Sequence, residues 1–402
     1  MLAIPDESWV SYNKVMEKIA INPSRLGWCL NAVQIDVKYL SAELKIAKKT
    51  LEQAMENKEV LSVNQLEKIA DYFKRNLLFF LESNEPKEEE IYSPQFRTIN
   101  NQKPIHSPKL RSFIEQAEKQ RQIYLSLLED LGEPMDNAWY PDDLNLNEGI
   151  KSISANIRQW LGLAASDDFN SMRDAVEQKG IMVIVSNGYN GKWQIDKKNP
   201  VRGLSLYYEM LPIIVVKKQV SLGAQTFTLM HELAHLLLHK ESAIDNDEDL
   251  YNYQGKEKEA NEFAGNLLVP DDFLNRIDTE QLLELEVQEY DAFLADYRKL
   301  WSVSNRAILV RLLINKRISQ HHYQLYVSHK EEQLKIEESR VSNTGRSIPR
   351  TYRHREPMNV FGKPFVYAVF DSLHNKNITL AKASTYLDNL KISDVRQLEQ
   401  YV

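Results

Sequence analysis

Residues 226–237 read Thr-Phe-Thr-Leu-Met-His-Glu-Leu-Ala-His-Leu-Leu and contain the pattern His-Glu-x-x-His. Residues four apart lie about 40° apart around an α-helix, so His231 and His235 project from one face and can bind the same ion. The other positions are apolar nearly all round the helix, which is typical of a buried helix. Buried polar side chains need partners, because each unpaired group costs several kcal/mol. The stretch therefore predicts a buried helix that presents a metal site.

The chemistry of these side chains favours zinc. Imidazole nitrogens bind zinc at about 2.0–2.1 Å. Glu232 follows His231 directly, so its carboxylate lies beside the metal, where it can accept a proton from water. A structural zinc site has no use for such a base. We therefore expect a catalytic site with Zn²⁺ as cofactor and Glu232 as the catalytic base.

A catalytic zinc usually has three protein ligands and one open position. A second predicted helix offers the third ligand, with Glu257 as the first candidate and Glu259 as its rival. Asn261 lies four residues after Glu257, on the same helix face. We expect Asn261 to orient a ligand by hydrogen bonding, without touching the metal itself.

Both stretches resemble the ImmA/IrrE family of bacterial and phage zinc metallopeptidases. The first is Phe-Thr-Leu-x-His-Glu-Leu-Ala-His-Leu-Leu-Leu-His over 227–239, and the second is Glu-x-x-Ala-Asn-x-Phe-Ala-x-x-Leu-Leu-Val-Pro over 257–270. Residues 202–207 and 212–216 also resemble the family's segment before its active helix. The resemblance covers about residues 150–320, and more weakly the regions on either side.

The resemblance implies a zincin-like fold in which His231, His235 and Glu257 hold the zinc and Glu232 is the base. Characterised members cleave a helix-turn-helix repressor and so switch on stress-response or mobile-element genes. The resemblance therefore implies a protein substrate, in particular a transcriptional repressor.

Composition narrows the class of protein. The chain has 402 residues, a net charge of -7 and 43% hydrophobic residues, which is ordinary for a globular protein and argues against one that coats nucleic acid. The single cysteine, Cys29, fits a reducing compartment. No apolar run approaches the ~20 residues of a membrane helix, and the first residues do not resemble a signal peptide. We expect a cytoplasmic protein without a membrane partner.

Residues 21–82 resemble the Cro/repressor-type helix-turn-helix domain. Helical periodicity predicts five short helices, of which the third, about 47–57, is expected to enter the DNA major groove. Residues 23–81 carry nine Lys or Arg against seven Asp or Glu, so the region is only slightly basic, and a protein-binding or dimerising role is the alternative. The candidate DNA contacts are Lys48, Lys49, Thr50 and Gln53.

The sequence predicts a multidomain fold. We expect an N-terminal all-α domain (1–82), a linker and connecting helix (83–147), an α+β metallopeptidase domain (148–335), and a C-terminal linker with a small α/β domain (336–402). The segment at 83–108 is expected to be extended, 241–254 to be a polar loop, and 365–370 to be a strand.

The function that follows is a zinc-dependent endopeptidase that cleaves a specific regulatory protein and is coupled to a DNA-binding domain. An edge strand near Leu204–Tyr208 is expected to hold the substrate by strand addition. The alternative is a DNA-binding regulator, or one half of a toxin–antitoxin pair, whose zinc site is sensory or structural.

Overall fold

The computed structural model describes residues 18–88, 92–133, 139–188, 191–219, 221–248, 254–338 and 350–402. The chain divides into two compact units. The first comprises Met1–Ser93 and Ile105–Ser112, and the second comprises Pro94–Pro104 and Phe113–Val402. Most of the predicted linker at 336–350 lies outside the described residues. None of the described helices is both long and apolar enough to cross a membrane.

The first unit contains the five short helices expected from the sequence. Polar side chains begin several of them: Asp36 accepts a hydrogen bond from the Tyr39 amide, and Ser62 forms a capping box with Gln65. Their apolar faces close a core that includes Leu40 and Leu51. The helices are α1 (Pro23–Ala32), α2 (Val37–Leu44), α3 (Lys48–Ala54), α4 (Val63–Phe73) and α5 (Leu77–Leu81).

The second unit is built on a four-stranded mixed sheet with the order β1-β3-β2-β4. β1 (Met182–Val185) pairs parallel with β3 (Ile213–Val216), which pairs antiparallel with β2 (Val201–Leu206). β4 (Ala243–Asn246) pairs antiparallel with β2 and forms the other edge. β1 and β3 are apolar and buried along their whole length, as a strand covered on both faces requires.

The expected edge strand near 204–208 is therefore wrong, because β2 is paired on both sides. The strand that covers its second side, β4, lies inside the segment expected to be a polar loop. β4 reads Ala-Ile-Asp-Asn, and Asp and Asn are depleted in strands, so its sequence has a low strand propensity. Its pairing with β2 overrides that low propensity.

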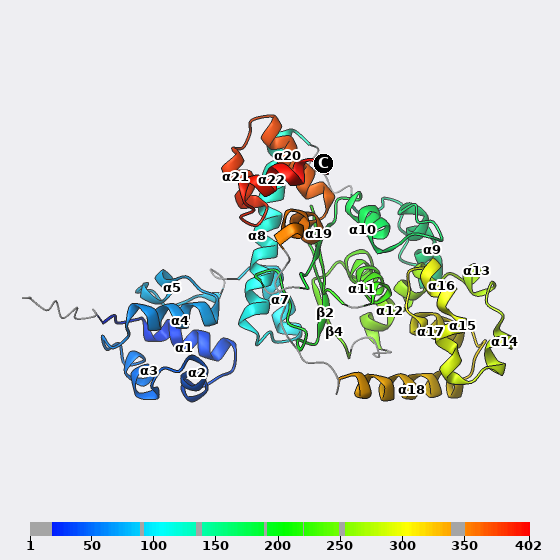
Figure 1. The fold of residues 1–402 in the computed structure, drawn as a ribbon, viewed down its shortest axis with the longest axis horizontal. Coiled ribbons are helices and arrows are strands. Elements are labelled where there is room, and N and C mark those ends of the chain that lie inside the picture. The colour runs from blue at the N-terminus through cyan, green and yellow to red at the C-terminus, as the bar shows by residue number, and fades with distance from the viewer. Residues whose placement is uncertain are drawn as a thin grey trace, which may run out of the picture. The chain divides into compact units, whose positions relative to one another are not determined.

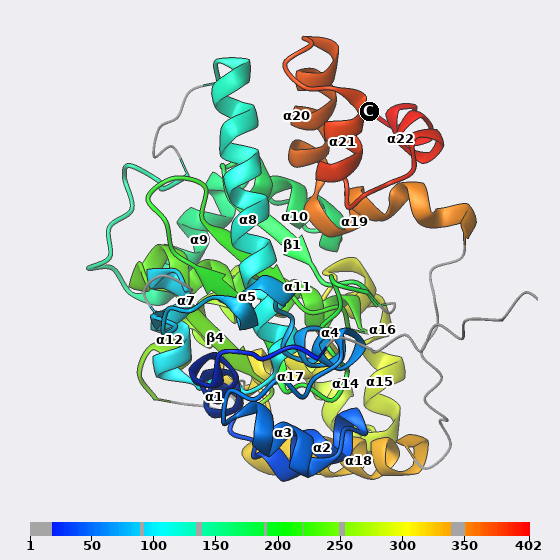
Figure 2. The same cartoon turned by 90° about the vertical axis from the view of Figure 1, so that its left-hand side faces the viewer.

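Helices cover both faces of the sheet. α9 (Ile150–Trp160), α10 (Phe169–Glu177), α11 (Leu222–Ala234) and α12 (Gly255–Leu268) match the helices expected in this region. Figure 1 shows the sheet between α11 on one side and the helices α7 and α8 on the other. In the view turned by 90°, α8 lies in front of the sheet (Figure 2).

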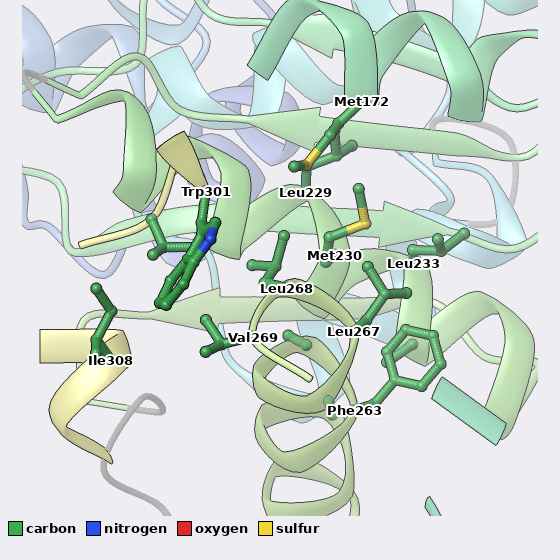
Figure 3. Packing of buried hydrophobic residues seen from close by; sticks show 14 of the residues in the cluster. Met172, Leu229, Met230, Leu233, Phe263, Leu267, Leu268, Val269, Trp301 and Ile308 are labelled. Carbon is green, nitrogen blue, oxygen red and sulfur yellow. The ribbon is translucent and has the colours of Figure 1, made fainter. Parts of the chain in front are cut away.

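The main core lies where α11 and α12 meet. Leu229 and Leu233 of α11 and Phe263 and Leu267 of α12 have no exposed surface, and Figure 3 shows them converging. The helices that follow α12 add further side chains to this core: α13 (Asp271–Leu274), α14 (Thr279–Glu284), η3 (Val287–Glu289), α15 (Tyr290–Phe293), α16 (Ala295–Leu300), α17 (Asn305–Ile314) and α18 (Gln320–Glu338).

The C-terminal tail is helical where the structure describes it, so the expected α/β tail is wrong. It consists of η4 (Arg350–Arg355), α19 (Glu356–Phe361), α20 (Lys363–His374), α21 (Leu380–Tyr386) and α22 (Ile392–Glu399). The predicted strand at 365–370 is part of α20. Its aromatic and β-branched residues suggested a strand, but Pro364 starts a helix and Phe365, Val369 and Phe370 share one buried face.

The region expected to be an extended linker is also partly helical. α7 (Pro94–Gln102) buries Phe96 and Ile99, which lie three residues apart on one face. The connecting helix predicted after it is α8 (Pro108–Leu131). At the end of α7, Gln102 Nε2 donates to the Ser242 carbonyl at 2.9 Å, and Lys103 Nζ donates to the Ile244 carbonyl at 2.8 Å. α7 is thereby tied to β4.

Gly223, at the start of α11, provides a test of this packing. A Cβ atom there would lie 2.3 Å from the Val303 carbonyl carbon and 2.6 Å from the Ser304 amide nitrogen, which are backbone atoms and cannot rotate away. We expect Gly223→Ala to lower the free energy of unfolding by about 1–3 kcal/mol, measured by urea denaturation. Gly149→Ala, where nothing lies within 4 Å of the added atom, is the control. Equal stability of the two variants would contradict the close packing.

Candidate metal centre

α11 carries both histidines of the His-Glu-x-x-His motif into the interior. His231 lies in its last turn, and His235 begins a π-helical turn, η1 (His235–His239), that continues it. Both side chains are almost fully buried, and their Nε2 atoms are 3.2 Å apart. The helix and the common face that the sequence predicted are therefore present.

Two carboxylates from other elements complete the group. Asp245 of β4 places Oδ2 at 3.3 Å from His231 Nε2 and 3.5 Å from His235 Nε2. Glu257, in the first turn of α12, places Oε2 at 3.4 Å and 3.8 Å from the same two nitrogens. The four donor atoms all lie within 4.8 Å of one another. Helix α11, strand β4 and helix α12 thus converge on one point.

These distances match a metal site in scale. A tetrahedral zinc ion with ligands at about 2.0–2.1 Å holds its ligand atoms about 3.3 Å apart. The separation of the two imidazole nitrogens and their four distances to the carboxylate oxygens run from 3.2 to 3.8 Å. Both carboxylate oxygens of Asp245 and Oε2 of Glu257 are buried and make no hydrogen bond to the described residues. Buried carboxylate oxygens without a hydrogen bond fit a cation at the centre of the group.

The imidazoles and carboxylates of the group shift one another's pKa values. Burial alone would lower the pKa of His231, but the Asp245 and Glu257 carboxylates outweigh it and raise that pKa to about 9. Burial likewise favours neutral Asp245, yet the two imidazoles hold its pKa well below the ordinary value. The cluster therefore favours negative carboxylates facing positive charge, which a bound cation also satisfies.

The structure separates the two rival glutamates. Glu257 lies beside the imidazoles, whereas Glu259 Oε2 lies 3.1 Å from His239 Nε2. His239 Nδ1 is in turn 3.0 Å from His235 Nδ1. The second of these contacts engages Nδ1 of His235, so Nε2 is the nitrogen that faces the cluster, and together they fix the orientation of the ring. Asn261 lies one turn after Glu257 on α12 and is half-buried.

Glu232 lies beside the cluster, against strand β2. It is fully buried, and a Cβ atom on Gly203 would lie 2.4 Å from its Oε1. A larger residue at position 203 would force this carboxylate and the Thr228 methyl group to move. Burial, and then the neighbouring Asp245 carboxylate, raise the pKa of Glu232 well above its ordinary value. A raised pKa is typical of carboxyl groups that exchange protons in catalysis.

Asp245 is the one residue of the group that the sequence did not predict. It lies 10 residues after His235, in the segment expected to be a loop, and only the pairing of Asp245 with Gly203 of β2 brings it to the site. One signal was available: Ala243 and Ile244 are apolar and directly precede it, within an otherwise polar segment.

The residues predicted to contact DNA lie together on α3 of the first unit. Lys48 and Lys49 are exposed, and Thr50 and Gln53 are half-exposed. Lys48 Nζ lies 3.0 Å from Glu52 Oε1, one turn away. The four side chains therefore share a short helix with one acidic neighbour.

Comparison with known families agrees with this site. Residues 176–313 match the model of the Peptidase_M78 family, described as the IrrE N-terminal-like domain. The matched region contains all of β2, β3 and β4 together with α11 and α12. It implies a zincin-like peptidase of the IrrE/ImmA type and supports the expected resemblance to that family. No curated protein matches the chain.

Metal content tests the centre directly. We expect the purified protein to carry about one zinc ion per chain, measured by mass spectrometry of the metal after desalting. The double variant His231→Ala/His235→Ala removes two of the four donors and should lose the metal. Glu232→Gln should retain it, because Glu232 is not among the four. Full zinc occupancy in the double variant would contradict the site.

Proposed function

We propose that this protein is a zinc-dependent endopeptidase whose metal is held by His231, His235 and Glu257. The observation that supports the proposal is the position of Glu232: a fully buried carboxyl group lies beside a cluster of donors of the size that zinc requires. Zinc bound there supplies Lewis acidity, which polarises a peptide carbonyl and makes water easier to deprotonate.

The protein's own residues transfer the proton and orient the metal ligands. Glu232 accepts the proton from the attacking water and passes it to the leaving amine. Its buried setting against Gly203 fixes the carboxylate in place and raises its affinity for a proton. His239 and Glu259 hold the His235 ring through the relay at Nδ1, and we propose that Asn261 orients a ligand in a similar way.

The substrate that we propose is a specific regulatory protein, in particular a helix-turn-helix repressor. Main-chain pairing along a strand carries little sequence information, so selectivity has to come from other surfaces. The edge strand that carries Asp245 is β4. The Lys103 side chain already hydrogen-bonds the carbonyl of Ile244 in β4, and Gln102 hydrogen-bonds that of Ser242, directly before the strand. A generic peptide therefore meets competition for that edge, which favours a substrate that is also recognised elsewhere.

One observation favours a second candidate function. Four protein donors surround the site, and structural zinc ions have four protein ligands. On this reading the chain is a DNA-binding regulator, or part of a toxin–antitoxin pair, and its zinc is sensory or structural. The presence of Glu232 favours the peptidase, because a structural site does not need an additional buried carboxylate.

Replacement of the base separates the two functions. We expect Glu232→Gln to lower cleavage of a co-expressed neighbouring gene product by about 100- to 10,000-fold while zinc content is unchanged. Cleavage is scored by electrophoresis and by mass spectrometry of the fragments. Glu280→Gln, an exposed glutamate on α14, is the matched control and should leave cleavage intact.

Two results would count against the peptidase. Cleavage that survives in Glu232→Gln would contradict the catalytic role, and zinc-loaded wild type that cleaves nothing in the cells that normally contain it would favour the regulator. Rapid digestion of casein by the wild type would contradict the narrow substrate range.

We also propose that the first unit binds DNA through α3, with Lys48 and Lys49 on phosphates and Thr50 and Gln53 on base edges. Two adjacent lysines exposed at the start of a short helix support this assignment. Phosphate contacts make affinity fall steeply with salt, whereas base contacts set specificity.

DNA binding is tested on the full-length Glu232→Gln protein by electrophoretic mobility shift. We expect binding to promoter DNA of its own locus, with Lys48→Glu/Lys49→Glu weakening it for every sequence and Gln53→Ala relaxing specificity. The control Lys197→Glu/Lys198→Glu changes the charge equally at two adjacent exposed lysines of the second unit. Absence of any shift at low salt would favour the protein-docking alternative.

A further inference from the structure

We propose that Asp245 is a displaceable fourth ligand, which occupies the coordination position needed by water and so holds the metal centre in a closed, resting form. This inference rests on the proposed metal site and adds a means of regulating it. It concerns the one donor that neither the motif nor the family resemblance supplies.

The geometry places Asp245 among the donors as closely as Glu257. Its Oδ2 is as close to His231 Nε2 (3.3 Å) as Glu257 Oε2 is (3.4 Å), and it is closer to His235 Nε2 (3.5 against 3.8 Å). With three ligands already supplied by the two histidines and Glu257, the fourth corner of a tetrahedron is where water binds in a catalytic site. Asp245 is the fourth side chain within reach of an ion held by those three.

Burial supports the same conclusion. Only 4% of Asp245 is exposed, and both of its carboxylate oxygens lack a hydrogen bond to the described residues. A buried carboxylate without a hydrogen bond is costly, and this one faces two imidazoles that are themselves metal ligands by type, so the group points to a cation shared among them. Two neutral imidazoles with the carboxylates of Asp245 and Glu257 would also balance the double positive charge of zinc.

Asp245 differs from the other donors in what holds it. His231, His235 and Glu257 lie on helices packed into the main core, whereas Asp245 lies on a short edge strand of four residues. The pairing of β4 with β2 is irregular between Val201 and Gly203, next to the partner of Asp245. β4 pairs with a strand on one side only, and on its other side hydrogen bonds from Gln102 and Lys103 hold Ile244 and the preceding Ser242. Such an element opens more easily than a helix packed in the core. Asp245 is therefore the ligand that can leave while the other three remain.

The consequence is a latent peptidase. While Asp245 occupies its position, the metal is closed to water and to a substrate carbonyl. Displacement of β4 frees the position without dismantling the centre. The site then has two states. With Asp245 bound it has the four ligands of a structural zinc, and with Asp245 displaced it has the open position and the base of a peptidase.

Cobalt-loaded protein provides a test that does not depend on catalysis. The visible absorption of Co²⁺ reports its ligands, and acetohydroxamate is a probe that binds an open metal position. If Asp245 occupies the site for at least ~90% of the time, the apparent dissociation constant of the probe rises at least about tenfold. We therefore expect Asp245→Ala to respond to acetohydroxamate at about one tenth of the concentration that wild type requires, or less.

Two further variants make the comparison strict. Asp245→Asn keeps the shape of the side chain but is a weaker ligand, so it should also respond at lower concentration. Asp247→Ala removes an exposed carboxylate two residues away and should behave as wild type. Circular dichroism of each variant reports that the fold is retained.

The outcomes distinguish this inference from the proposed function. Cobalt binding with the same probe affinity in wild type and Asp245→Ala would overturn the closed form alone. A folded Asp245→Ala protein that no longer holds cobalt would show an indispensable ligand and would overturn displacement. Wild type that binds neither zinc nor cobalt would overturn the metal centre and this inference together.

Discussion

The burial of opposite charges at one point is the constraint on which the second unit depends. Two imidazoles and three carboxyl groups lie where water is largely excluded, and each would be costly alone. Their attraction is strong for the same reason, since a low dielectric magnifies every charge–charge interaction. The pKa of His231 is raised and that of Asp245 is lowered because each stabilises the charged form of the other.

The packing around this point serves to bring three elements close together. Gly223 lets α11 begin directly against the backbone of Val303 and Ser304, and Gly203 lets Glu232 lie against β2. On the facing helix, Ala260 and Ala264 are fully buried small residues, which permit the close approach of α12 to α11. Each glycine removes a clash at one place. The geometry of the donors therefore depends on side chains that take no part in binding.

The sequence predicted the site residues that lie on regular helices and missed the one that strand pairing brings to the site. The spacing of His231, Glu232 and His235 is a property of one helix, so their common face could be read directly. Glu257 required only a second helix of regular periodicity. Asp245 reaches the site through a strand of low intrinsic propensity that exists because β2 offers it a partner, and no single-segment pattern reports such pairing. The same missing strand made β2 look like an edge.

The helices of the first unit were predicted well for the same reason, since capping residues such as Ser62 and apolar spacing are local signals. The tail was misjudged because Phe365–Phe370 has the composition of a strand. Its burial pattern, with Phe365, Val366, Val369 and Phe370 on one face, is helical, and this pattern also satisfies the core. Periodicity was the better guide there than propensity.

The attachment of α7 to β4 has a consequence for the behaviour of the protein in concentrated solution. An edge strand with free carbonyl groups is a template on which a second chain can pair, and such pairing begins aggregation. The ammonium group of Lys103 hydrogen-bonds the Ile244 carbonyl of β4, and the amide of Gln102 hydrogen-bonds the Ser242 carbonyl directly before the strand. The lysine also adds a charge that an incoming strand would have to desolvate. The helix that lies where a linker was expected thus covers part of an edge on which a second copy of the chain could pair.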